Sequence, residues 1–318
     1  NEEVAFRKEV VSIKESRTKN RLELFEEDHK LQYIKNSNSN KYGEFESEFN
    51  KPFDSLSIKA LNHKEDQGWF LHEINSAQTK ITSWITGLDS LKKVEIVYTD
   101  NKTIIDTVTF KVTEKKNLVD TLTTIKDNIN ANFDLNQNIM LSLKRPFVSY
   151  ETNNIRLYED SLLVTTFFTD ISLRDFELAY DFKENTNYYL FIPPGTFEDI
   201  YGLKNDTLLK QFKTKEKSDY GIINLNLTPY FTENYILQLY KGKKLVEEQF
   251  YSGSQKITYS YLKPGDYTIK LIIDNNNNKK WDTGIYLKNQ QPEKVIYYEK
   301  PIKIRANWDN DIIWSIIE

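Results

Sequence analysis

Residues 261–274, YLKPGDYTIKLIID, carry the clearest structural signal in this chain of 318 residues. The Pro264-Gly265 pair predicts a tight turn, because proline presets φ and glycine accepts a positive φ. After the turn, positions 267, 269, 271 and 273 are apolar, whereas positions 268 and 270 are polar. A period of two places one row of side chains in a core and the other toward solvent. The stretch therefore predicts a β-hairpin with one buried face.

The same alternation recurs along the chain. Residues 93–98 (KVEIVY) and 108–112 (VTFKV) flank the turn residues TDNK, and residues 235–246 repeat the arrangement around KGK. Asp and Asn favour turns because they hydrogen-bond to their own backbone, so these segments predict further hairpins. We also expect the run NSNSN at 36–40 to form an exposed hairpin tip. The fold class predicted is mainly β, with tandem antiparallel β-sandwich domains.

One segment, residues 117–132 (NLVDTLTTIKDNINAN), has a helical pattern instead. Its apolar residues Leu118, Leu122, Ile125 and Ile129 are four, three and four positions apart, which suits one face of an amphipathic helix. Its place between strand-rich regions predicts one connecting helix. Polar and charged stretches then divide the chain into three domains: residues 1–132, ending in the connector helix, residues 133–217, and residues 218–318.

Composition excludes several classes of function. Lys and Arg number 43 against 47 Asp and Glu, giving a net charge of −4, whereas nucleic-acid-binding domains usually carry a basic excess. No apolar run approaches the roughly 18 residues of a membrane helix. The absence of Cys rules out disulfides, Cys-ligated zinc and a thiol nucleophile. The chain starts at Asn1 without Met or a signal peptide, so we expect a processed or truncated piece.

Candidate catalytic residues are scarce. The histidines are His29, His63 and His72, and no HExxH, GxSxG, Walker A or GxGxxG motif occurs. His63 and the His72-Glu73 pair could form a metal or acid–base cluster, but an exposed polar loop is the favoured interpretation. We therefore predict no catalytic residues and no organic cofactor.

The loop after the 261–274 hairpin is a candidate calcium site. It reads DNNNNKKWDTG, and its alternate positions are Asp274, Asn276, Asn278, Lys280 and Asp282. Oxygen ligands at alternate positions match the opening of a calcium loop. Two departures weaken the match, since Lys279 stands where an EF-type loop has Gly and Ile285 stands where it has Glu. The alternative is a rigid loop of Asx turns with Trp281 packed beneath it.

The second half of the chain resembles a known family. Residues 261–267 look like the L-x-P-G-x-Y hairpin of prealbumin-like or carboxypeptidase-regulatory-like β-sandwiches. With QPEKV (291–295) and RANWD (305–309), they resemble the C-terminal module of Ig-like-domain outer-membrane lipoproteins of Bacteroidota. Residues 188–214, YYLFIPPGTFEDIYGLKNDTLLKQFKT, resemble the closing strands of the bacterial Ig-like domain that precedes that module. The resemblance covers about residues 140–318, and DNNNNK replaces the family's DxNxNG loop.

The resemblance implies a non-catalytic lipoprotein on the surface of the outer membrane, with a lipid anchor outside this segment. We expect a structural or protein-interaction subunit, whose partner is an outer-membrane β-barrel complex in assembly or secretion. The alternative is a glycan-binding accessory protein of a polysaccharide-utilisation system, because 14% aromatic residues could include an exposed stacking platform. Neither hypothesis involves nucleic acid, and calcium is the one ion expected.

Overall fold

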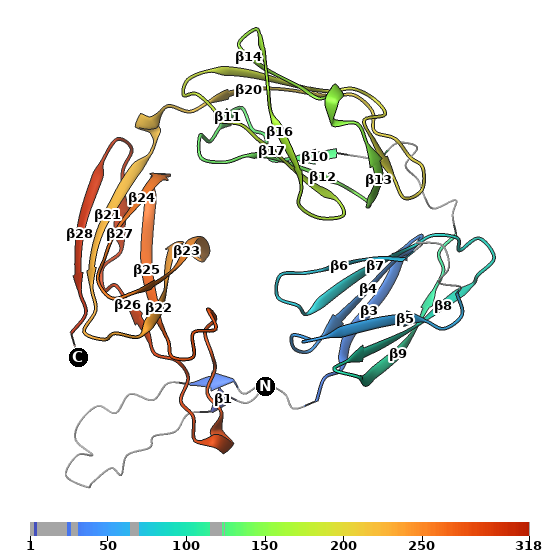
Figure 1. The fold of residues 1–318 in the computed structure, drawn as a ribbon, viewed down its shortest axis with the longest axis horizontal. Coiled ribbons are helices and arrows are strands. Elements are labelled where there is room, and N and C mark those ends of the chain that lie inside the picture. The colour runs from blue at the N-terminus through green and yellow to red at the C-terminus, as the bar shows by residue number, and fades with distance from the viewer. Residues whose placement is uncertain are drawn as a thin grey trace. The chain divides into compact units, whose positions relative to one another are not determined.

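The computed structural model describes residues 3–4, 24–26, 31–63, 70–114, 123 and 125–317. They form mostly β-strands and the loops that join them (Figure 1), which confirms the mainly β fold class. The chain divides into two compact units. One unit is His29–Lys215, and the other combines Asn1–Asp28 with Glu216–Glu318. Within the described ranges, no helix has the length and apolar character needed to cross a bilayer.

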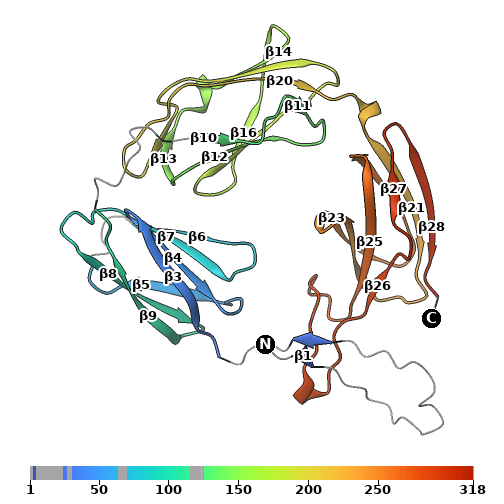
Figure 2. The same cartoon turned by 180° about the vertical axis from the view of Figure 1, so that it is seen from behind.

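The first sandwich of His29–Lys215 consists of two antiparallel sheets (Figure 1 and Figure 2). Its sheets run in the orders β3 (Ile34–Lys41), β4 (Glu44–Phe49), β7 (Lys80–Ile85), β6 (Phe70–Ile74), and β5 (Leu56–Ala60), β8 (Lys93–Asp100), β9 (Thr103–Lys111). Alternate residues of β4 and β8 are buried and meet in one core, including Phe45, Phe49 and Ile96. Two sheets that each bury one face against the other form a sandwich.

The predicted hairpin at 93–112 is confirmed. β8 and β9 pair antiparallel, and the turn residues Asn101 and Lys102 have φ of 47° and 66°. The tip expected at 36–40 is wrong, because this run lies within β3 and the turn to β4 falls at Tyr42-Gly43. Asn38 Nδ2 donates to Glu46 across the two strands at 2.9 Å, so polar residues suit this solvent-facing pair.

The second sandwich occupies the rest of this unit. Its strands are ordered β10 (Ile125–Asp127), β12 (Ile139–Leu143), β17 (Asp175–Ala179), β16 (Phe167–Asp170) in one sheet, and β11 (Asn132–Phe133), β20 (Leu208–Thr214), β18 (Asn187–Ile192), β14 (Arg156–Glu159), β15 (Leu162–Val164) in the other. A separate pair joins β13 (Phe147–Tyr150) to β19 (Phe197–Asp199). Their inward residues form one core rich in Phe.

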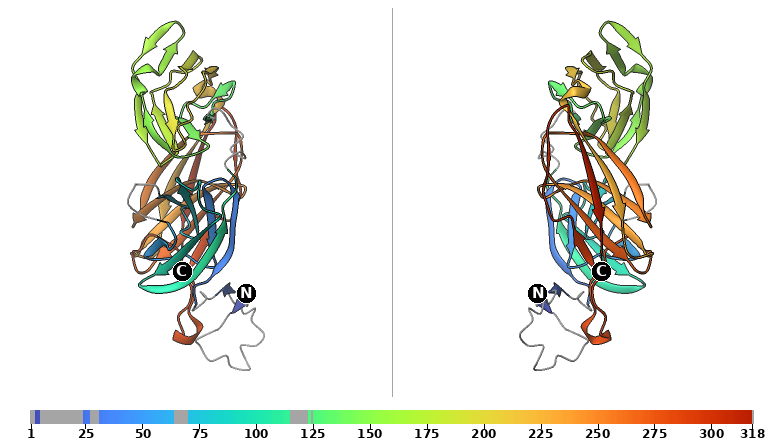
Figure 3. Two further views of the ribbon diagram at one scale, coloured as in Figure 1. Left: turned by 90° about the vertical axis from the view of Figure 1, so that its right-hand side faces the viewer. Right: turned by 90° about the vertical axis from the view of Figure 1, so that its left-hand side faces the viewer.

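The connecting helix predicted over 117–132 is wrong wherever the structure describes that segment. Ile125–Asp127 is a strand that pairs with β12, and Asn132–Phe133 pairs with β20. Residues 115–122 and 124 lie outside the described residues. From 125 to 317 the helical turns are short 3₁₀ segments, namely Thr152–Asn154, Lys217–Asp219 and Tyr286–Lys288, and Figure 3 shows mostly strands in this range.

The other unit contains the third sandwich. Its sheets are β24 (Gln255–Leu262), β21 (Gly221–Thr228), β28 (Asp309–Ser315), and β23 (Lys244–Ser252), β22 (Asn234–Lys241), β25 (Gly265–Asp274), β26 (Val295–Tyr297), with β27 (Ile302–Ile304) also pairing with β25. Tyr267, Ile269, Leu271 and Ile273 are buried, as the alternation in 261–274 predicts. Two pairings, β11–β20 and β21–β28, are parallel, so the sandwiches are antiparallel with these exceptions. Near the start of the chain, β1 (Glu3–Val4) pairs with β2 (Phe25–Glu26).

Three separate cores follow from these sheets, one for each sandwich. The division of the chain at residues 132 and 217 stays a prediction. The break between the two compact units falls at Lys215–Glu216.

Candidate functional site

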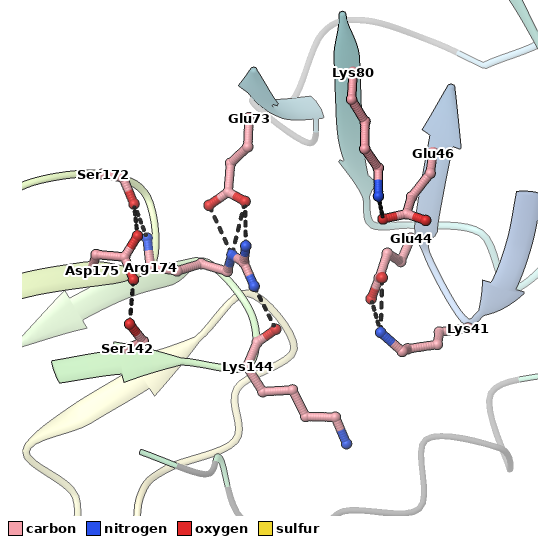
Figure 4. Close-up of polar contacts among 10 residues, drawn as sticks. All are labelled: Lys41, Glu44, Glu46, Glu73, Lys80, Ser142, Lys144, Ser172, Arg174 and Asp175. Atoms are coloured by element: carbon pink, nitrogen blue, oxygen red, sulfur yellow. Dashed lines mark hydrogen bonds and ion pairs between the residues drawn. The ribbon is translucent and has the colours of Figure 1, made fainter. Parts of the chain in front are cut away.

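An ion pair joins the two sandwiches of His29–Lys215. Arg174 ends the turn between β16 and β17, and its Nε lies 2.8 Å from both carboxylate oxygens of Glu73 on β6 (Figure 4). Its Nη2 lies 2.7 Å from Glu73 Oε2, and its guanidinium lies 5.4 Å from the Trp84 ring centroid. Burial opposes the charge of Arg174, but the hydrogen bond and charge of Glu73 outweigh it and raise the arginine pKa. The parallel hydrogen bonds of this forked pair fix both the position of the guanidinium and its orientation relative to the Glu73 carboxylate.

The turn that carries Arg174 is itself held in place. The Asp175 carboxylate accepts hydrogen bonds from Ser142 Oγ at 2.5 Å and from Ser172 Oγ at 2.7 Å (Figure 4). Arg174 Nη1 also lies 3.5 Å from the Lys144 carbonyl oxygen. The arginine is therefore preorganised to meet Glu73.

A pocket of about 500 Å³ lies beside this ion pair. Across it, Lys80 Nζ lies 2.6 Å from Glu46 Oε1, and nearby Lys41 Nζ lies 2.8 Å from Glu44 Oε1 (Figure 4). Burial raises the Glu46 pKa, but Lys80 and Asn38 outweigh it, so the net pKa is lowered. The Arg174 and Lys80 cations that line this pocket thus form ion pairs with the Glu73 and Glu46 carboxylates.

A second contact between the same sandwiches is made by Tyr201, in the turn after β19. Its hydroxyl donates to the Tyr42 carbonyl oxygen at 3.1 Å, and the two rings lie 5.7 Å apart. Tyr201 also packs against the core of the first sandwich. Arg145 and Asp199 hold Tyr201 in place. Their ion pair of 3.1 Å is buried, and Asp199 accepts a hydrogen bond from the backbone N–H of Tyr201.

The candidate calcium loop is tied together by its own side chains. The two oxygens of Asp274 accept the backbone N–H groups of Asn278 and Lys279, at 3.1 and 2.9 Å. Asp282 Oδ2 accepts from the side-chain amides of Asn276 and Asn278. Lys280 donates its backbone N–H to Asn278 Oδ1 at 2.8 Å. The structure thus places the predicted residues in one loop, where side-chain oxygens of Asp274, Asn278 and Asp282 accept hydrogen bonds from N–H groups of the same loop.

One further acidic residue contacts this loop and is not part of its consecutive motif. Glu293 is buried, and its oxygens accept the backbone N–H groups of Asn275 and Asp282 at 2.8 and 3.1 Å. Burial, with the charges of Asp282 and Asp274, raises the pKa of Glu293. It lies outside the loop in sequence, so ligand spacing could not find it. Within the described residues, no group of three or more His, Asp or Glu side chains is arranged to hold a metal ion.

The histidines do not assemble a catalytic centre in the part of the chain that the structure describes. His63 Nε2 lies 3.2 Å from the Thr86 carbonyl oxygen. The His72-Glu73 pair lies in strand β6 and not in the polar loop expected for it. His72 lines the pocket beside Glu73, and partial desolvation there lowers its pKa although the side chain is in part exposed. His29 lies outside the described residues.

No family model and no curated protein matches the chain. Among solved structures, it is similar to an I-band fragment of titin, with 8% identity over 91% of this chain and 100% of that chain and a TM-score of 0.20. It is also similar to the tandem Ig repeats of Dlar, with 11% identity, 59% and 98% coverage and a TM-score of 0.22. The TIE protein of Bacillus anthracis shows 10% identity, 91% and 58% coverage and a TM-score of 0.20. Similarity at this level carries no information on activity, ligand or partner.

Proposed function

We propose that this chain is a non-catalytic structural and protein-interaction subunit of a bacterial cell surface. The observation that supports this most is the joint between the sandwiches of His29–Lys215. A forked ion pair, Glu73–Arg174, and a packed side chain, Tyr201, both cross from one sandwich to the other. Interfaces between domains are usually small and permit relative motion, so two specific crossings favour a stiff element.

The chemistry of the joint also favours a structural role. A general acid or base needs a proton-transfer group held within reach of a substrate. Here Glu73 is occupied by Arg174, Glu46 by Lys80, and Asp175 by two serine hydroxyls. Such saturated pairs hold a geometry and leave little capacity for catalysis.

The cellular setting of the proposal comes from the family resemblance of residues 140–318. It implies an outer-membrane lipoprotein whose lipid anchor lies outside this segment. The partner proposed is a β-barrel complex of the same membrane, for which a stiff tandem of sandwiches is a suitable spacer.

The experiment is cross-linking in the native host followed by purification of the full-length protein from membranes. We expect an integral outer-membrane protein to be recovered in stoichiometric amounts. Arg174→Glu should reduce the recovery, because it places two carboxylates together at the joint. The matched control is Lys93→Glu, which breaks an exposed pair with Glu95 on one strand. Recovery of no membrane partner with the wild-type protein would contradict the proposal.

A second candidate function is that of a glycan-binding accessory protein. One observation favours it, which is the pair of solvent-accessible rings Tyr158 and Tyr189, 6.1 Å apart on an outer sheet face. A glycan array probed with the full chain tests this candidate directly, and an array without a signal would remove it.

A further inference from the structure

The outer face of the β20–β18–β14 sheet carries a group of aromatic residues. Tyr158 on β14 stands directly opposite Tyr189 on β18, which stands opposite Gln211 on β20. In the next row, Arg156 stands opposite Phe191. Residues directly opposite on one face lie close enough for their side chains to interact. The register therefore builds a continuous surface from three strands.

This surface is separate from the core. The neighbours of these residues along the strands, Leu157, Leu190 and Phe212, are the ones that point inward and are fully buried or nearly so. Tyr158, Tyr189 and Phe191 are partly exposed. These three aromatic side chains therefore lie outside the core of the sandwich.

The rings of Tyr158 and Tyr189 are tilted relative to each other and are not stacked. Their centroids are 6.1 Å apart and their planes are inclined by 54°. A shallow pocket of about 530 Å³ lies over them. The faces of the rings are apolar and their hydroxyls are polar, so the pocket offers both kinds of contact to one ligand.

Polar groups surround the rings. Arg156, Asp160, Ser161 and Gln211 line the same pocket. Asp160 lies in the turn between β14 and β15 with a φ of 50°, and its backbone N–H donates to the Asn187 carbonyl oxygen at 2.7 Å. The turn is thus anchored, and Asp160 Oδ1 accepts a hydrogen bond from Asn187 Nδ2 at 3.4 Å. Arg156 and Asp160 carry opposite charges, so the lining as a whole has no net charge.

We infer that this surface binds a neutral oligosaccharide, with sugar rings stacked on Tyr158 and Tyr189. The inference rests on the second candidate function, glycan binding. A pyranose ring has an apolar C–H face that stacks on an aromatic ring and hydroxyls at its edge that need donors and acceptors. Aromatic faces with an arginine, a carboxylate and an amide at the rim match both needs. Aromatic residues and arginine are also enriched at protein–protein interfaces, but the hollow over the two rings suits a small ligand better than a flat protein surface. An acidic glycan would be favoured by an excess of cations, which this lining does not have.

The test is a printed array of neutral oligosaccharides from β-glucan, xylan, mannan and α-glucan, with polygalacturonate and alginate as acidic probes. The strongest neutral probe is then titrated by calorimetry against wild-type protein, Tyr158→Ala and Tyr189→Ala. We expect each substitution to weaken binding about fivefold, since one stacked ring contributes on the order of 1 kcal/mol and about 1.4 kcal/mol corresponds to tenfold. Tyr158→Phe should retain most of the affinity, because the ring remains.

The matched control is Tyr297→Ala, which removes an exposed tyrosine from β26 in the other unit. It should leave the affinity unchanged, and thermal melting should show that all variants are folded. Equal binding by wild type, Tyr158→Ala and Tyr189→Ala would overturn this site and leave the glycan-binding candidate standing. Signals on acidic probes alone would overturn the inferred ligand class, and an array without any signal would overturn both.

Discussion

At the residue scale, two buried tyrosines differ in what their hydroxyls meet. Tyr98 Oη in the first sandwich is 2.9 Å from Ser47 Oγ, which donates to it. Tyr259 Oη in the third sandwich has no hydrogen-bond partner among the described residues. Burial raises the pKa of Tyr98 to about 12 and raises that of Tyr259 as well, so both hydroxyls stay protonated at neutral pH.

Removing each hydroxyl should therefore have opposite effects. Tyr259→Phe should raise the free energy of unfolding of its sandwich by about 1 kcal/mol, because it removes a desolvated polar group without a partner. Tyr98→Phe should lower that of the first sandwich by about 1 kcal/mol, because it leaves the Ser47 hydroxyl buried alone. Urea titrations of the two variants measure both values. Destabilisation by Tyr259→Phe would show that its hydroxyl has a partner after all.

Glu159 is the third residue whose environment gives a clear expectation. Its carboxylate accepts hydrogen bonds from Lys183 Nζ, Tyr180 Oη at 2.7 Å and Tyr188 Oη at 3.0 Å. The Lys183 and Tyr180 hydrogen bonds outweigh burial, with a smaller contribution from Tyr188, and lower its pKa from 4.5. A lowered pKa stabilises the fold above the ordinary pKa, and this stability is lost as pH falls through the folded-state value.

Glu159→Gln should accordingly cost about 2 kcal/mol near neutral pH, since charge-assisted hydrogen bonds are replaced by weaker ones. The difference from wild type should shrink as pH falls below the ordinary 4.5. Urea titrations from pH 7 to pH 3 measure it, with the exposed Glu151→Gln as control. A difference independent of pH would mean that the carboxylate charge is not the source of the stability.

At the scale of elements, alternation was a reliable guide and helical spacing was not. The β8–β9 hairpin and the buried row of β25 follow from a period of two, which β8 keeps over 93–98 and β25 keeps over 267–271, before the last four residues of β25 are all buried. In 117–132 the apolar spacing fits a helix, yet Ile125 pairs with Leu143 of β12. The segment is rich in Thr, Asn, Asp and Ile, which are weak helix formers, so pairing with an existing sheet prevails.

The candidate site was largely invisible in the sequence for a different reason. Arg174 and Glu73 are separated by 101 positions, and Tyr201 and Tyr42 by 159. No local pattern connects such residues, and one ionic or aromatic residue among many carries no signal of its own. The predicted calcium loop was visible because its residues are consecutive, although the buried Glu293 was not.

The calcium hypothesis has a prediction at this scale. Binding would place a cation near the Asp274, Asp282 and Glu293 carboxylates, where burial, with the charges of Asp282 and Asp274, raises the Glu293 pKa. We expect millimolar CaCl₂ to raise the melting temperature of the third sandwich by a few degrees and EDTA to reverse this, as for any ligand selective for the folded state. Glu293→Gln should reduce the response, whereas the exposed Glu299→Gln should not. A melting temperature that ignores both calcium and EDTA would contradict calcium binding.

At the scale of the whole molecule, the two sandwiches of His29–Lys215 meet at a glycine. Gly43 has a φ of 71°, and a Cβ built there would lie 1.9 Å from Tyr201 Oη and 2.5 Å from the Ile85 carbonyl oxygen. Because Gly43 has no side chain, the Tyr201 ring of the other sandwich can pack against it. Gly242 is a natural comparison, because its φ is 59° and nothing lies within 4 Å of such a Cβ.

These two glycines separate the cost of backbone strain from the cost of disturbing the joint. Gly242→Ala should lower the free energy of unfolding by about 1 kcal/mol, the cost of a left-handed conformation, whereas Gly43→Ala should lower it by about 2 kcal/mol more through overpacking.

Tyr201→Ala should weaken the joint between the sandwiches without changing the strands. In calorimetry, wild-type His29–Lys215 should unfold as one transition because its sandwiches share packed side chains, and Tyr201→Ala should split that transition into two. Tyr201→Phe keeps the ring and should preserve the single transition. If Tyr201→Ala also unfolds in one step, the sandwiches are coupled by other contacts, and the stiffness attributed to this joint must be reassigned to them.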